Sequence, residues 1–106
     1  MITKEEVRQI CEKYGCEYLV MQLAEECAEL IHAALKLIRV RQGTTPVGRE
    51  VALENYMEEC GDVILMLGCA SEAILSEEEM KQIDAIIDYK TERMKRRLLQ
   101  ENDKQT

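Results

Sequence analysis

The amino-acid sequence predicts an all-α fold, an antiparallel helical bundle with one short helix and three long ones. Apolar residues make up 46% and charged residues 33% of the chain, which has one Pro and no Phe or Trp. This composition favours helices over strands. Apolar side chains also recur at helical spacing in four segments. Because the connections between these segments are short, neighbouring helices should run antiparallel.

The first two helices are bounded by local signals. Thr3 with Glu6 three residues later forms a capping box, which predicts the start of the short helix. Gly15 predicts its end. The second helix is predicted over residues 17–41, and Gly43 lies just beyond its end.

The third and fourth helices follow a single loop. Residues 42–48 hold the Gly and Pro residues of that loop, and residues 49–74 are predicted as the third helix. Ser76 with Glu79 three residues later predicts the start of the fourth. We expect this last helix to fray by about Gln100, leaving residues 101–106 as a disordered tail.

Length and charge restrict the class of protein. The chain has 106 residues, and we expect one helical domain over residues 1–100. Its net charge of −7 argues against binding of a nucleic-acid polymer. The longest uncharged run, residues 63–71, is too short to span a membrane. The chain begins with charged residues rather than a signal peptide, and its five cysteines form no CxxC pair. These features predict a cytoplasmic protein with reduced thiols.

Acidic residues interrupt two otherwise apolar helices. Glu26 and Glu29 lie three residues apart on the second helix, as do Glu59 and Asp62 on the third. Each pair shares one helix face. At about 4 Å, two like charges repel by about 4 kcal/mol at an effective dielectric of about 20. If both pairs face the bundle interior, a divalent cation such as Mg²⁺ or Mn²⁺ would relieve the repulsion. The alternative is that they lie on solvated faces.

These motifs resemble the EExxE and ExxD signature of the MazG-like, all-α nucleoside triphosphate pyrophosphohydrolases. The resemblance extends over about residues 17–97. It implies hydrolysis of an NTP or dNTP to the monophosphate and pyrophosphate, usually with Mg²⁺, by a homodimer or homotetramer. It also implies a set of site residues. The metal ligands would be Glu26, Glu29, Glu59 and Asp62, and Glu25 would assist them or activate water.

A triphosphate substrate also needs cationic and polar partners. Lys36 follows Glu29 by two helical turns, and Lys90 and Arg93 lie three residues apart on the last helix. We expect these three side chains to bind phosphates. Asn55 lies one turn before Glu59, where it could contact a ribose or a base. All four could instead be ordinary surface side chains.

Two other functions fit parts of the pattern. A non-catalytic helical interaction module would keep the acidic pairs in solvent. A di-iron carboxylate protein would use Glu29 with His32 three residues later, which is the local ligand motif of such bundles.

Overall fold

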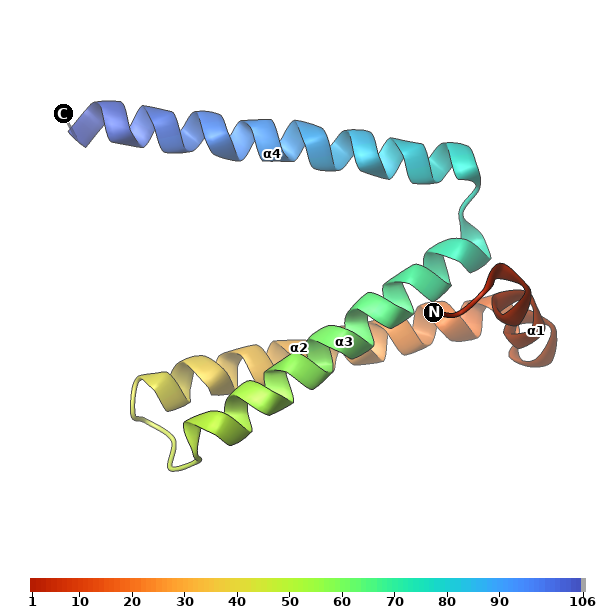
Figure 1. Cartoon of the computed structure of the whole chain (residues 1–106), viewed down its shortest axis with the longest axis horizontal. Helices are drawn as coiled ribbons and strands as arrows, with labels where there is room; N and C mark the ends of the chain where they lie inside the picture. Colours follow the sequence, from red (N-terminus) through yellow and green to blue (C-terminus); the bar gives the residue numbers. More distant parts are fainter. Residues whose placement is uncertain (106) are drawn as a thin grey trace. The chain divides into compact units, whose positions relative to one another are not determined.

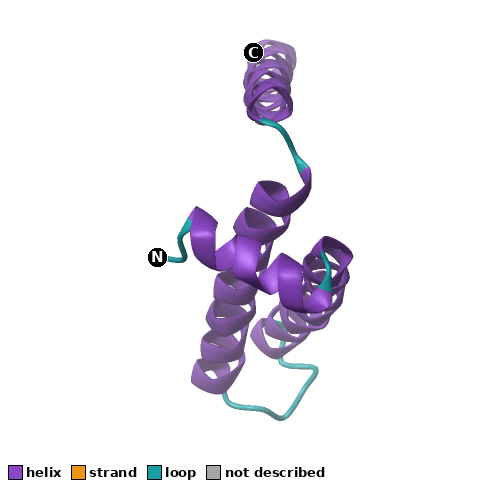
Figure 2. Cartoon of the chain, turned by 90° about the vertical axis from the view of Figure 1, so that its right-hand side faces the viewer, coloured by secondary structure: helices purple, strands orange, loops and turns teal. Residues whose placement is uncertain are grey.

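The computed structural model describes residues 1–105, with side chains as far as Asp103. It contains four helices (Figure 1), and the described residues form no strand (Figure 2). The helices are α1 (Lys4–Tyr14), α2 (Cys16–Arg41), α3 (Arg49–Ile74) and α4 (Glu77–Gln105). The predicted all-α fold and its four helices are therefore confirmed. Residue 106 of the predicted tail lies outside the described residues.

The start of α1 is the predicted capping box. The Thr3 side chain accepts a hydrogen bond from the backbone N–H of Glu6, and the Glu6 carboxylate accepts one from the backbone N–H of Thr3. The helix ends at Gly15, whose N–H donates to the Cys11 carbonyl at 2.8 Å. Gly15 has a φ of 88° and a ψ of 148°, a conformation that side chains with a Cβ rarely adopt. Glycine therefore permits the sharp corner between α1 and α2.

The helices α2 and α3 pair side by side and run antiparallel, as Figure 1 shows. The loop between them is closed by Thr44, whose N–H and hydroxyl both donate to the Arg39 carbonyl at 3.0 Å. Gly43, in the same loop, has a φ of 75°. The bounds of α3 match the prediction, and α2 begins one residue earlier than predicted.

The fourth helix starts as predicted but is longer. The Ser76 side chain accepts from the backbone N–H of Glu79, and the Glu79 carboxylate accepts from the backbone N–H of Ser76. The helix continues to Gln105, so the prediction that it frays near Gln100 was wrong. The physical reason is that no glycine or proline follows Gln100 to stop a helix.

The chain divides into two compact units, Met1–Ile74 and Leu75–Thr106. In the first unit α1 packs on the α2–α3 pair, and Val7, Leu19, Cys69 and Ala70 form a buried cluster. The second unit is built around α4 alone. The membership of α4 in an antiparallel bundle stays a prediction. Among the described residues, none of the helices combines the length and apolar character that a membrane crossing requires.

The Gly15 corner gives a stability prediction. Gly15→Ala should lower the free energy of unfolding by about 1–3 kcal/mol, because alanine is strained at this backbone conformation. Gly68→Ala is the matched control. Gly68 lies within α3, and a Cβ added there meets nothing within 4 Å. This control should raise stability by about 1 kcal/mol through helix propensity. Urea denaturation measures both, and equal effects of the two substitutions would contradict the account.

Candidate metal centre

Three carboxylates converge between α2 and α3. Glu26 comes from α2, while Glu59 and Asp62 come from consecutive turns of α3. One oxygen atom of each lies within 4.8 Å of the others, and all three residues are half-buried. We call Glu26, Glu59 and Asp62 the acidic cluster. The expectation that acidic residues of two helices meet is thus fulfilled for three of the four predicted ligands.

Apolar packing on both sides holds the acidic cluster together. Along the helix pair, Leu19 and Cys69 are buried toward the α1 end. Ala33 and Ala52 are buried toward the loop end. On each of the two helices, the cluster residues lie between these buried positions. Small alanines let helix backbones approach closely, so the two helices remain paired along the stretch that carries the like charges.

The surroundings of the acidic cluster disfavour the ionised forms of Glu26 and Glu59. Partial burial raises the pKa of Glu26, and the charges of Asp62 and Glu29 and a hydrogen bond with Asp62 raise it further. Partial burial likewise raises the pKa of Glu59, followed by the charges of Asp62, Glu26 and Glu29. Loss of hydration and like-charge repulsion therefore act in the same direction on both groups.

The Oε2 atom of Glu59 has almost no contact with solvent and no hydrogen-bond partner. A buried carboxylate oxygen of this kind is costly unless a proton, a donor or a cation satisfies it. Three carboxylates with one unsatisfied oxygen form a donor set of the kind that binds Mg²⁺ or Mn²⁺. The residues present therefore fit a hard divalent cation.

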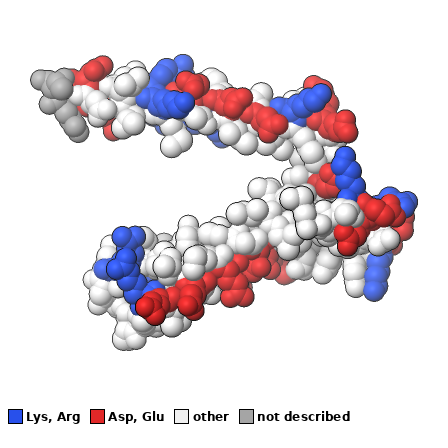
Figure 3. Space-filling view, in the orientation of Figure 1, with Lys and Arg blue, Asp and Glu red and all other residues white. Residues whose placement is uncertain are grey.

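No ion pair found among the described residues joins a basic side chain to the acidic cluster. Within the described part of the chain, ion pairs join Arg8 with Glu5 and Glu12, and Lys95 with Glu92. None of them involves the cluster. Figure 3 shows a band of acidic side chains along the α2–α3 pair, with basic side chains gathered where the loop joins the two helices. Within the unit Met1–Ile74, the residues that raise the pKa of Glu26 and Glu59 by their charge are all acidic.

The other predicted carboxylates lie near the cluster but outside it. Glu29 is exposed, although its charge raises the pKa of both Glu26 and Glu59. Glu25 is also exposed and acts on Glu26 in the same way. Glu58 was not predicted, yet its charge raises the pKa of Glu59. Its position next to Glu59 in the sequence was the available signal.

The predicted substrate contacts fall in different units. Lys36 on α2 and Asn55 on α3 are half-buried in the unit that carries the acidic cluster. Lys90 is exposed on α4, and Arg93 on the same helix is half-buried. These two belong to the other unit, so their part in the site stays a prediction. His32 is exposed and does not belong to the cluster, which gives no support to the di-iron alternative.

The raised pKa of Glu59 gives a pH-dependent prediction. The pKa of Glu59 is raised above its ordinary value of 4.5, so folding favours the protonated carboxyl. The resulting contribution to the free energy of unfolding is present at low pH and is lost as the pH rises through the raised pKa. Glu59→Gln removes the charge and should raise the melting temperature in EDTA at neutral pH. The gain should shrink toward zero between about pH 7 and about pH 4, as wild-type carboxyls become protonated.

The matched control is Glu54→Gln, an exposed position on α3 five residues before Glu59 and outside the cluster. It should leave the melting temperature almost unchanged at every pH. A melting temperature of Glu59→Gln that is equal to or below that of this control at neutral pH would contradict the repulsion.

Comparisons of the chain with protein-family models, with curated proteins and with solved structures gave no match. The resemblance to the MazG-like enzymes therefore stays a prediction based on the two acidic motifs. Independently of that resemblance, the geometry brings together a set of oxygen ligands between α2 and α3 that could hold a metal ion.

Proposed function

We propose that this chain is a divalent-metal-dependent nucleoside triphosphate pyrophosphohydrolase that releases a nucleoside monophosphate and pyrophosphate. The observation that carries the proposal is the acidic cluster, three half-buried carboxylates from two helices with no basic partner among the described residues. The motif resemblance supplies the reaction, and the cluster supplies a place for the cation that the reaction uses.

Mg²⁺ is the expected cation, with Mn²⁺ as a substitute, because both prefer carboxylate and water oxygens. Glu26, Glu59 and Asp62 would hold it. Glu29, one helical turn beyond Glu26, can supply a further oxygen if its side chain turns inward. When bound, such a cation neutralises phosphate charge and lowers the pKa of a coordinated water.

The remaining residues have supporting roles in this proposal. The chain has a net charge of −7, so a polyphosphate is repelled until the acidic cluster is neutralised. Glu25 and Glu58 border the cluster and can accept a proton from an attacking water. Lys36 lies about 15 Å along the α2 axis from Glu26, a distance at which it can meet the far end of a nucleotide. Asn55 is placed to hydrogen-bond the sugar or base.

A pyrophosphate-release assay tests the proposal. Purified protein with excess Mg²⁺ should hydrolyse at least one member of a panel of ribo-, deoxyribo- and modified nucleoside triphosphates. Asp62→Asn should lower the rate by about 100-fold or more, because it removes a ligand charge from the metal site. Glu54→Gln, on the same helix outside the cluster, should keep the wild-type rate. Release of no pyrophosphate from any nucleotide by folded, metal-loaded protein would refute the proposal.

We also propose that the enzyme is a homodimer or homotetramer. Only six hydrophobic residues are buried among the described ones, while many large apolar side chains are exposed. On α4 the exposed residues include Ile83, Ile86, Ile87, Met94 and Leu98, between 39% and 69% accessible. On α2 and α3 it includes Met21, Ile31, Leu35, Ile38, Leu53, Met57, Ile64, Leu65 and Leu67. Apolar surface on this scale is typical of a subunit interface.

The apolar face of α4 gives the corresponding prediction. Ile86→Glu should shift the wild-type oligomer toward monomer, because a charge buried in an interface lacks its hydration. The control is Gln82→Glu, which adds the same charge on an exposed polar position of α4. Sedimentation equilibrium measures both. A wild-type chain that stays monomeric at all concentrations would contradict self-association.

A further inference from the structure

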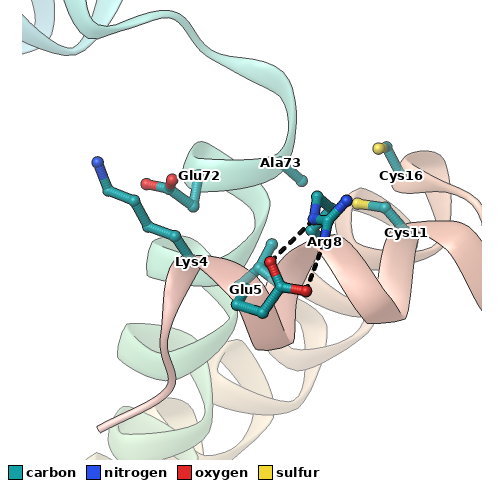
Figure 4. Close-up of a pocket in the computed structure, with 8 residues that line it drawn as sticks. Lys4, Glu5, Arg8, Cys11, Cys16, Glu72 and Ala73 are labelled. Carbon is teal, nitrogen blue, oxygen red and sulfur yellow. Dashed lines mark hydrogen bonds and ion pairs between the residues drawn. The ribbon is translucent and has the colours of Figure 1, made fainter.

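Two cysteines meet at the corner between α1 and α2. Cys11 lies in the last turn of α1, and Cys16 is the first residue of α2. Gly15 forms the corner between them, and its N–H donates to the Cys11 carbonyl at 2.8 Å. Both side chains line one surface cavity of about 350 Å³, beside Arg8 and Ala73. Figure 4 shows the two sulfur atoms on the cavity side of this corner.

We propose that Cys11 and Cys16 are a redox-active dithiol that a peroxide oxidises to an intramolecular disulfide. The proposal concerns a modification site separate from the acidic cluster. Cys16 precedes Glu26 by ten residues, about 15 Å along the α2 axis, so the two sites do not share side chains. It is independent of the proposed hydrolase activity.

Contact between the two thiols supports this pairing. A hydrogen bond with Cys16 raises the pKa of the Cys11 thiol to about 11, and partial burial adds to the rise. Cys11 therefore keeps its proton at neutral pH and acts as the resolving thiol. Cys16 lies in the first turn of α2 and lines the same surface cavity. We assign Cys16 as the thiol that reacts first.

The reaction balances with hydrogen peroxide as the oxidant. The Cys16 thiolate attacks one peroxide oxygen and the O–O bond breaks, giving a sulfenic acid at Cys16 and a hydroxide that becomes water with one proton. The sulfur of Cys11 then attacks the Cys16 sulfur, and the S–O bond breaks. The departing hydroxide takes the Cys11 proton and leaves as a second water. Two thiols lose two electrons in total, and the peroxide gains them.

The other cysteines are less suited to this chemistry. Cys69 is only 2% exposed and lies in the buried cluster, where a peroxide has no access. Cys27 and Cys60 are half-buried within α2 and α3, each next to a glutamate of the acidic cluster. Neither of them lines the corner cavity that Cys11 and Cys16 share. Oxidation should therefore select the corner pair.

Peptide mapping of the full chain tests the proposal. The folded protein is treated with hydrogen peroxide at neutral pH, its free thiols are alkylated, and trypsin cuts at Lys13 between the two cysteines. The expected product joins residues 9–13 to residues 14–36 through a bond that dithiothreitol breaks. Fragment spectra should place that bond at Cys16. Cys27→Ser, which removes the other cysteine of the longer peptide, should leave the product unchanged.

Two further variants separate pairing from random oxidation. Cys16→Ser should abolish the joined peptide, and Cys11→Ser should leave a sulfenic acid at Cys16 that dimedone traps. Circular dichroism verifies that each variant remains helical. The peptide map of the wild-type protein tests the disulfide even if a variant does not fold. Oxidised wild-type protein with no joined peptide, or with a bond to Cys27 instead, would overturn the proposal whatever the nucleotide assay shows.

Discussion

Repulsion between carboxylates of α2 and α3 is the constraint around which this chain is organised. Glu26, Glu59 and Asp62 bring oxygens within 4.8 Å of one another at a half-buried position without a basic partner among the described residues. Both glutamates respond with raised pKa values. A protein that needed only stability would replace such a cluster with apolar side chains. A cation bound there, as proposed above, would relieve the repulsion among these three carboxylates.

Local signals were enough to predict most of the helix bounds. The capping boxes at Thr3 and Ser76 and the stop at Gly15 depend on hydrogen bonds between residues a few positions apart. A short stretch of sequence is therefore enough to predict these helix ends. The end of α4 was predicted wrongly because the polar residues after Gln100 suggested a disordered tail. A helix continues where no stop signal follows, and α4 extends to Gln105. The place of α4 depends on contacts between distant segments, which no local pattern encodes.

The candidate site was predictable because its charges interrupt apolar helices. Spacing alone paired Glu26 with Glu29 and Glu59 with Asp62, yet Glu29 is exposed outside the cluster. Residues three apart differ by about 60° around a helix, so only one of a pair need face the partner helix fully. That rotation is set by apolar packing along α2 and α3. Glu58, which the motif did not single out, also raises the pKa of Glu59 by its charge.

The most direct test of the cation is a crystal structure of the protein grown with Mn²⁺, using the anomalous scattering of manganese to locate it. The account predicts an anomalous peak between α2 and α3, with oxygens of Glu26, Glu59 and Asp62 at metal-ligand distances of about 2.0–2.3 Å. Crystals in which those three carboxylates point apart into solvent, with no peak between the helices, would contradict it.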